Sequence, residues 1–323
     1  MENIDQKSLV TKETAKDIGT ILMEAGKITL AELQQIVSFQ KQHNILFGEA
    51  AVKLRILQEE DVAWALAVQF SYPYLKKGEN TISKEVVAIH DPFSQQVETI
   101  RTIRSEMVLS GVGKTIKTIA VISPGEGEGK TFVASNLAAV FAQLGSKTIL
   151  MDLNFRSPRI HEIFHMRNNC GLSNLIIKRV DFNQAVHFRL IPSLHILPSG
   201  TRPPNPVELL GWQETKEIVS YMKDIYDVII IDTPSFLKTG DALLISNLSD
   251  AVIIVVAKGY TKVGSFAMVK KQLDSSGVRI IGSLINETGR KKRKIAGKLA
   301  SLQAIKPTSL QAGKLSGWRA GKH

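Results

Sequence analysis

Hydrophobic residues follow two different patterns along this chain of 323 residues. Near the N-terminus they recur every three or four positions, as in "IGTILMEAGKITLAELQQIVSFQ" (18–40), which indicates short amphipathic helices. From residue 115 onward, continuous Val and Ile runs such as "VIIID" (228–232) and "AVIIVVA" (251–257) alternate with helical segments. Strands of this kind are buried on both faces, so the pattern predicts an α/β fold with a mostly parallel sheet covered by helices.

The N-terminal pattern occurs twice, because residues 18–40 align with residues 47–69 at a constant offset of 29 positions. Each unit predicts a short helix, a turn and a second helix, and two such units would pack as a small all-α repeat domain. We assign residues 1–80 to this domain and interpret it as a regulatory or docking module. The polar residues 76–92 are predicted to be a linker to the α/β domain, which we place at 81–289.

A glycine-rich stretch, "SPGEGEGKT" (123–131), lies between a predicted buried strand and a helix. A turn in this position can direct several backbone N–H groups at phosphate oxygens, so the stretch predicts a P-loop. Pro124 occupies the first glycine position of the strict motif, but the end of the motif is intact. We expect the side chains of Glu126 and Glu128 to point outward, to solvent or to a neighbour. The predicted phosphate-binding positions are three glycines, a lysine and a threonine: Gly125, Gly127, Gly129, Lys130 and Thr131.

Two predicted strands end in an aspartate, Asp152 after "TILM" and Asp232 after "VIII". Asp232 is placed to hold Mg²⁺ through water, as in a Walker B motif. Asp152 could reach the same metal or accept a proton from an attacking hydroxyl. A lone aspartate after an apolar run is more often a turn or cap residue, but the P-loop and two such aspartates together predict binding of ATP and Mg²⁺.

A predicted helix at 97–111 carries Glu98, Arg101 and Arg104 at intervals of three residues, which places them on one face. Such a triad is commonly a solvated set of ion pairs. The other interpretation is a contact between subunits of a homo-oligomer, and the spacing leaves both open.

Charge is distributed unevenly along the chain, whose formal net charge is +11. Residues 290–323 hold ten Lys or Arg and no acidic residue, so the remainder is nearly neutral and no nucleic-acid partner is expected. We predict that this segment is a basic tail, either flexible or lying on anionic lipid, with Leu299 and Leu302 at helical spacing. The single Cys170, the absence of a leader pattern and the strand-length apolar runs predict a cytoplasmic protein.

The ordered motifs resemble those of bacterial tyrosine kinases of the polysaccharide type: the Glu98, Arg101, Arg104 triad, "SPGEGEGKT", "ILMDLNFRSPR", "GLSNLI", "LPSGTRPPNPVELL" and "IIIDTP". Together with the N-terminal repeat, they resemble more closely the chain-length-determinant kinases of exosortase-linked exopolysaccharide systems, the EpsG type. The repeat itself is similar to the MshEN domain of secretion and pilus-assembly ATPases, which binds cyclic di-GMP.

This resemblance implies ATP-dependent phosphorylation of tyrosines on the chain itself or on sister subunits. The activity would regulate chain length and export of an exopolysaccharide, through a membrane polysaccharide co-polymerase at the inner membrane. Lys130 would contact the β- and γ-phosphates, and Thr131 and Asp232 would hold Mg²⁺. Asp152 would lie beside the metal or act as the base, Arg156 would close the second motif, and the triad would form a ring interface.

Several departures from the family pattern leave alternatives open. Asn154 stands where the family has a second carboxylate, and no tyrosine follows Tyr260. An ATP-binding regulatory switch without tyrosine kinase activity is therefore one alternative, and a MinD/ParA-like ATPase is another, although Gly125 stands where that group has a lysine. In the repeat, Asp17 and Leu46 replace the arginines of the MshEN motif, which favours a protein-binding version over cyclic di-GMP binding.

Overall fold

The computed structural model describes residues 17–70, 81–188, 191–287 and 302–305. The chain divides into two compact units, Met1–Lys77 and Gly78–His323, and each is described by itself.

The first unit consists of two helix pairs built around a small apolar core that includes Leu22, Ile36 and Ala65. Its helices are α1 (Ile18–Glu24), α2 (Leu30–His43), α3 (Phe47–Lys53) and α4 (Glu59–Gln69). Helix α1 packs on α4, and α2 packs on α3, so each repeat contributes one helix to each contact. The two pairs begin differently. The Asp17 side chain caps α1 by accepting a bond from Thr20 N at 2.7 Å, whereas Leu46 precedes α3 without a side-chain cap.

The two repeats share one close helix contact at matching positions. A Cβ added at Gly19 would lie 2.7 Å from Leu33 Cδ1, and one added at Gly48 would lie 2.6 Å from Val62 Cγ1. Both glycines and both contacted residues are separated by the offset of 29 positions that the sequence shows. At both positions a larger residue would force the facing side chain to move, so glycine suits this close approach of the two helices.

The second unit contains one sheet of eight strands in the order β3-β4-β2-β5-β1-β6-β7-β8. The six central strands are parallel, which confirms the predicted α/β fold, and short antiparallel strands close both edges. The strands are β1 (Thr118–Ile122), β2 (Thr148–Asp152), β3 (His187–Phe188), β4 (Leu194–Leu197), β5 (Val228–Asp232), β6 (Ala251–Ala257), β7 (Ile280–Asn286) and β8 (Leu302–Ile305).

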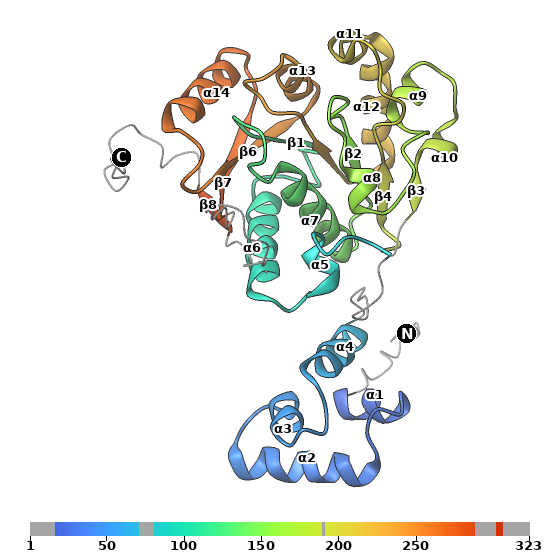
Figure 1. The fold of residues 1–323 in the computed structure, drawn as a ribbon, viewed down its shortest axis with the longest axis vertical. Coiled ribbons are helices and arrows are strands. Elements are labelled where there is room, and N and C mark those ends of the chain that lie inside the picture. Colours follow the sequence, from blue (N-terminus) through green and yellow to red (C-terminus); the bar gives the residue numbers. More distant parts are fainter. Residues whose placement is uncertain (1–16, 71–80, 189–190, 288–301, 306–323) are drawn as a thin grey trace, which may run out of the picture. The chain divides into compact units, whose positions relative to one another are not determined.

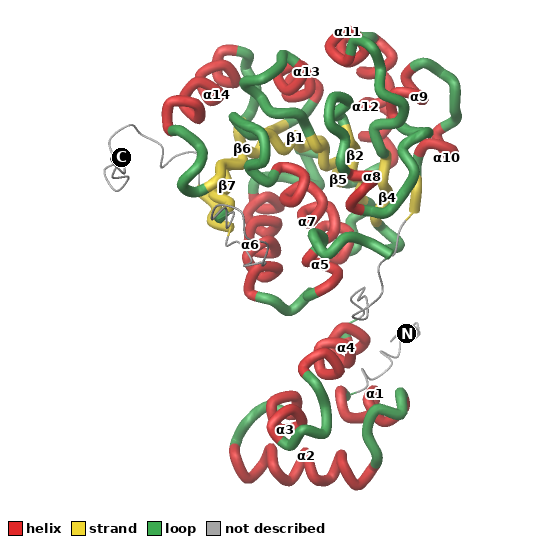
Figure 2. Tube along the Cα trace, viewed as in Figure 1, coloured by secondary structure: helices red, strands yellow, loops and turns green. Residues whose placement is uncertain are grey.

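Helices cover both faces of this sheet (Figure 1), and Figure 2 shows the strands as one layer between them. Helices α5 (Val87–His90), α6 (Gln95–Leu109) and α7 (Lys130–Gln143) lie on one face. The other face is covered by α11 (Pro206–Gly211), α12 (Gln213–Ile225), α13 (Asp241–Leu248) and α14 (Val263–Ser275). Short helices α8 (Ile160–Ile163), α9 (Leu172–Ile176) and α10 (Phe182–Ala185) lie in the β2 to β3 connection. A large hydrophobic cluster joins residues of β1, β2, β5 and β6 to the second group of helices.

Two sequence predictions differ from this structure. The described part of the predicted linker is packed, because Ile82, Val86 and Ile89 are buried and Asn136 of α7 bonds the backbone of Glu85 at 2.8 Å. In the tail, the helical spacing predicted to include Leu302 is wrong for the described residues, since 302–305 form strand β8 against β7. The remaining tail residues, among them Leu299, lie outside the described ranges.

Within the described ranges, none of the helices combines the length and the apolar content that crossing a bilayer requires.

Candidate nucleotide-binding site

The P-loop connects the buried strand β1 to helix α7, as the sequence predicts. Gly127 and Gly129 have φ angles of 67° and 99°, in the left-handed region that favours glycine. A Cβ added at Gly129 would lie 2.0 Å from Asn286 Nδ2, so this position requires glycine for space as well as for conformation. The Asn286 side chain, at the end of β7, donates to the Glu128 carbonyl at 3.0 Å and so holds the backbone of the loop.

The two glutamates of the P-loop behave differently. Glu126 points outward, as predicted, and its carboxylate pairs with Lys238 Nζ at 2.7 Å, with both side chains about two-thirds exposed. The same prediction is wrong for Glu128, whose residue is only 2% exposed. Its Oε2 accepts a bond from Gly125 N at 2.7 Å, and its Oε1 accepts one from Thr261 Oγ1 at 2.5 Å. The Glu128 side chain therefore points into the loop, where it binds the Gly125 N–H group.

Lys130, the first residue of α7, is folded into the P-loop and is 8% exposed. Its Nζ donates to Ser123 Oγ at 2.9 Å and to the Gly125 carbonyl at 3.2 Å. Burial lowers the pKa of Lys130, while the charges of Asp232, Glu128 and Glu126 act in the opposite direction. The ammonium group is therefore held among oxygen acceptors at the position where phosphates would enter the loop.

Asp152 and Asp232 lie directly opposite each other at the ends of the paired strands β2 and β5. Both are fully buried, and we call them the carboxylate pair. Thr131 Oγ1 donates to Asp232 Oδ2 at 2.8 Å, so the P-loop threonine touches this pair. Desolvation and the charge of Asp232 raise the pKa of Asp152 to about 8, and desolvation raises that of Asp232 to about 6.

The carboxylate pair fits a Mg²⁺ ion, because this metal prefers oxygen ligands and uses one or two carboxylates together with substrate phosphates. Asp232 Oδ1 is buried and has no hydrogen-bond partner among the described residues, so it is available as a ligand. The described residues contain no cluster of three or more His, Cys, Asp or Glu side chains suited to a metal. A Mg²⁺ ion held here would need the nucleotide phosphates to complete its coordination.

Asp152 is held in place by three backbone N–H groups. Oδ1 accepts from Asn154 N at 3.0 Å, and Oδ2 accepts from Arg159 N and Ile160 N, each at 3.1 Å. The Asn154 side chain closes a local turn, donating to the Ser157 carbonyl at 2.8 Å and accepting from Ser157 N at 3.2 Å. The residue that replaces the second carboxylate of the family therefore fixes the loop that positions Asp152.

Arg156, which the resemblance assigns to the cofactor-binding residues as the close of the second motif, forms two bonds with Asp241 through its guanidinium group. The Nε to Oδ2 distance is 2.7 Å, and a second nitrogen lies 3.1 Å from Oδ1. Asp241 is 1% exposed and begins α13, while Arg156 stays partly open to solvent. This bidentate pair ties the loop after β2 to the segment after β5, so Arg156 braces two loops of the site.

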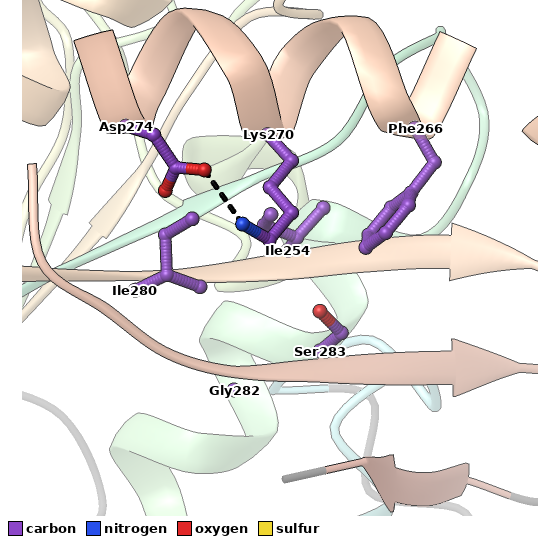
Figure 3. Close-up of a pocket in the computed structure, with 7 residues that line it drawn as sticks. All are labelled: Ile254, Phe266, Lys270, Asp274, Ile280, Gly282 and Ser283. Carbon is purple, nitrogen blue, oxygen red and sulfur yellow. Dashed lines mark hydrogen bonds and ion pairs between the residues drawn. The ribbon is translucent and has the colours of Figure 1, made fainter. Parts of the chain in front are cut away.

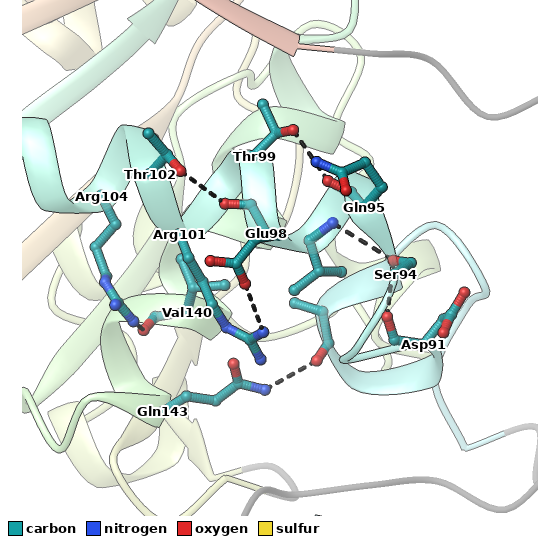
Figure 4. Close-up of polar contacts among 12 residues, drawn as sticks. Asp91, Ser94, Gln95, Glu98, Thr99, Arg101, Thr102, Arg104, Val140 and Gln143 are labelled. Carbon is teal, nitrogen blue, oxygen red and sulfur yellow. Dashed lines mark hydrogen bonds and ion pairs between the residues drawn. The ribbon is translucent and has the colours of Figure 1, made fainter. Parts of the chain in front are cut away.

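The three charged residues of α6 lie on one side of that helix, as predicted, but they contact different groups (Figure 4). Glu98 is 62% exposed and pairs with Arg101 at 3.4 Å, whereas the Arg101 side chain is only 13% exposed. Arg104 donates to the Val140 carbonyl near the end of α7 at 2.9 Å. Part of the triad thus serves packing of α6 on the P-loop helix, and Glu98 is the member most available to another molecule.

A separate cavity of about 160 Å³ lies between α14 and strands β6 and β7 (Figure 3). Ile254, Phe266 and Ile280 give it an apolar lining, and the Lys270 to Asp274 ion pair lies at one side. It shares no lining residue with the P-loop, so it has no place in nucleotide binding.

Sequence reasoning missed Thr261, Asn286 and Asp241 as residues that support the site. Each lies far along the chain from its partner, and none belongs to a local motif. The motif "SPGEGEGKT" includes Glu128, but the direction of its side chain depends on Thr261, a partner 133 residues away.

A P-loop between β1 and α7, with two buried aspartates at neighbouring strand ends, defines a P-loop nucleotide-binding protein. A family model described as an AAA domain matches residues 116–274. The chain is 35% identical over 205 residues to tyrosine-protein kinase YwqD of Bacillus subtilis, which covers 64% of this chain and 86% of that protein. It is 31% identical over 214 residues to putative tyrosine-protein kinase CapB of Staphylococcus aureus, covering 66% and 93% respectively.

Solved structures agree with these relatives. The chimerical protein CapA2B2 matches with 28% identity and a TM-score of 0.60, over 69% of this chain and 97% of that one. The kinase domain of the Escherichia coli tyrosine kinase ETK matches with 26% identity and a TM-score of 0.61, over 66% and 84%. The chain belongs to the bacterial tyrosine-kinase family, which confirms the predicted class of P-loop protein-tyrosine kinase.

Proposed function

We propose that this protein binds ATP with Mg²⁺ at the P-loop and phosphorylates tyrosines on itself or on sister copies, in control of exopolysaccharide chain length and export. The contact between Thr131 and Asp232, beside Asp152, is the observation that supports this most directly. It places a hydroxyl and two carboxylates at the end of the loop that would hold the phosphates.

The roles follow from these positions. The backbone N–H groups of the P-loop glycines would surround the phosphates, and Lys130 would exchange its bonds to Ser123 and Gly125 for phosphate oxygens. Thr131 and Asp232 would hold Mg²⁺, which when bound supplies positive charge to the β- and γ-phosphates.

Asp152 is the candidate for the base. The raised pKa means that its carboxyl group holds a proton at neutral pH before a cation arrives, and nearby positive charge favours its ionised form. The tyrosine oxygen would attack the γ-phosphorus, the bond to the bridging oxygen would break, ADP would leave, and Asp152 would accept the phenol proton. Three backbone N–H donors keep this carboxylate aimed during the transfer.

A regulatory switch that binds ATP without transferring phosphate to tyrosine is the second candidate. The side chain of Asn154 supports it, because that residue is bound to the Ser157 backbone and brings no additional negative charge to the metal site. Under this alternative the P-loop would still bind the phosphates of ATP, and the carboxylate pair would still lie beside Mg²⁺.

Incubation of the full chain with γ-labelled ATP and Mg²⁺ separates the two candidates. We expect phosphotyrosine in the parent protein and its loss in Lys130→Ala, which removes the cation inside the loop. Lys238→Ala is the matched control, since this lysine lies at the rim and is 65% exposed. ATP binding with no phosphotyrosine in the parent would establish the switch, and full activity in Lys130→Ala would reject the P-loop assignment.

For the first unit we propose an EpsG-type, MshEN-like docking domain that binds protein. It carries a groove of about 700 Å³ with an apolar lining that includes Phe47, Val62 and Leu66. Asp17 and Leu46 stand where MshEN domains have arginines. The Asp17 carboxylate caps α1, and Leu46 is 71% exposed at the groove. These side chains offer no bidentate donor to a guanine base, so cyclic di-GMP is disfavoured. Tight calorimetric binding of cyclic di-GMP would reverse this choice.

For its place in the cell we propose a homo-oligomer that is peripheral at the inner membrane and is bound to a membrane polysaccharide co-polymerase. The tail supplies ten cations without an anion, which suits anionic lipid headgroups. Binding to anionic vesicles should be strong at low salt and should be lost on truncation after Gly289, whereas ATP binding should persist. A truncated protein that still sediments with vesicles would place membrane attachment elsewhere.

A further inference from the structure

Tyr260 is a surface tyrosine that lies, like the P-loop, at the C-terminal ends of the parallel strands. It is 51% exposed and lies in the turn that follows β6. Strand β6 is hydrogen-bonded to β1, whose end leads into the P-loop, and both strands run in the same direction. The turn that carries Tyr260 therefore emerges next to the loop that would hold ATP.

Hydrogen bonds fix this turn and join it to the P-loop. Tyr260 N donates to the Ala257 carbonyl at 3.1 Å, and Ala257 N donates to Thr261 Oγ1 at 2.8 Å. The same Thr261 hydroxyl donates to Glu128 Oε1 at 2.5 Å. Tyr260 is thus one residue away from a direct contact with the predicted phosphate-binding loop.

The other tyrosines of the second unit are placed less favourably. Tyr226 is 1% exposed, and its hydroxyl group lies 2.6 Å from Nδ1 of the buried His195. Tyr221 is 53% exposed but lies near the end of α12, just before β5 begins. It is therefore near the N-terminal ends of the strands, away from the P-loop. Tyr72 and Tyr74 lie outside the described residues.

The charges around Tyr260 suit a phosphorylated side chain. Lys258 and Lys262 flank it at a distance of two residues on each side. The Lys258 side chain is 62% exposed and pairs with Glu287 at 2.5 Å, so its ammonium group is at the surface beside this turn. Nearby lysines stabilise the added negative charge of a phosphotyrosine through charge-assisted hydrogen bonds.

We propose that Tyr260 is an autophosphorylation site, an inference that rests on the proposed kinase function. The Tyr260 phenol oxygen forms a bond to the γ-phosphorus of ATP, and the bond from that phosphorus to the β–γ bridging oxygen breaks. ADP leaves, and the phenol proton passes to the Asp152 carboxylate. The products are ADP and a phosphotyrosine at the rim of the nucleotide loop.

Mass-spectrometric mapping of the full chain after incubation with ATP and Mg²⁺ tests this site. We expect phosphate on Tyr260 in the parent protein. Total phosphotyrosine should fall at least threefold in Tyr260→Phe and should be unchanged in Tyr221→Phe, the equally exposed control. Thermal unfolding and ATP binding of both variants would show that the domain is intact.

The outcomes distinguish this proposal from the kinase function on which it rests. Phosphate found only on Tyr72, Tyr74 or Tyr221 would reject Tyr260 and leave the kinase function standing. Bound ATP with no phosphotyrosine anywhere would reject both. Mapping in the parent protein needs no substitution, so a variant that fails to fold cannot obscure the result.

Discussion

Replacing Glu128 with alanine tests whether the inward carboxylate holds the P-loop in shape. The change removes both acceptors, which leaves the Gly125 N–H and the Thr261 hydroxyl without this partner in a buried position. It also removes negative charge that favours the cationic form of Lys130. We expect lower stability and weaker ATP binding from one substitution that touches no phosphate.

The magnitude follows from the two hydrogen bonds. A bond to a charged group contributes about 1.5–3 kcal/mol, so the pair contributes about 3–6 kcal/mol. Because 1 kcal/mol shifts Tm by about 2–4 °C in a domain of this size, Glu128→Ala should lower Tm by at least about 6 °C. Glu128→Gln keeps the shape and one acceptor, so we expect a loss of about 1 kcal/mol and a shift of about 2–4 °C.

Differential scanning calorimetry and ATP titration of the full chain would measure both effects. Glu128→Ala should also weaken ATP binding at least tenfold, which corresponds to about 1.4 kcal/mol. Glu126→Ala is the matched control two residues away, since that carboxylate is exposed and should change Tm little. Equal small shifts for the two alanine variants would show that the buried bonds of Glu128 do not hold the loop.

Three further predictions concern stability around the site. Asp152 has a folded pKa raised to about 8, so the metal-free protein should lose stability as pH rises from about 4, the ordinary carboxyl pKa, to about 8; Asp152→Asn should flatten that profile, by on the order of 2 kcal/mol between pH 6 and pH 8 in thermal unfolding. Asn154→Asp should lower stability by about 1 kcal/mol, because a carboxylate cannot donate to the Ser157 carbonyl, and an unchanged Tm would contradict this role. Arg104→Ala should lower Tm, whereas Glu98→Ala should leave Tm unchanged and reduce the mass measured by light scattering if this face joins subunits.

The fold was predictable because its central strands are continuous apolar runs that only a doubly covered parallel sheet can bury. The edge strands were not predictable: 187–188 and 302–305 are too short to carry a pattern, and their pairing depends on the sheet beside them. The segment at 81–92 carries apolar residues, but the run at 86–89 is too short to show a period, and its partners, such as Asn136 bonded to Glu85, lie about 50 residues away.

At the site, the sequence motifs name candidate residues that the structure brings together, but they do not name the residues that hold them in place. Lys130, Thr131 and the carboxylate pair belong to motifs in which residue type and spacing carry the signal. The brace between Arg156 and Asp241 joins loops 85 residues apart, and nothing local identifies it. Motif spacing therefore predicts which residues converge, while the three-dimensional packing decides their hydrogen-bond partners.

The two glutamates of the P-loop do not make this an acidic, phosphate-repelling loop. Glu126 is paired with Lys238 at the surface, and the charge of Glu128 lies close enough to Lys130 to influence its pKa. Each carboxylate is thus offset by a cation, and the inward one also organises the backbone by binding Gly125 N. Because the loop carries balanced charge, its N–H groups and the start of α7 supply the attraction for phosphate. The carboxylate pair is separate from this balance, and its raised pKa values limit its negative charge until a cation is present.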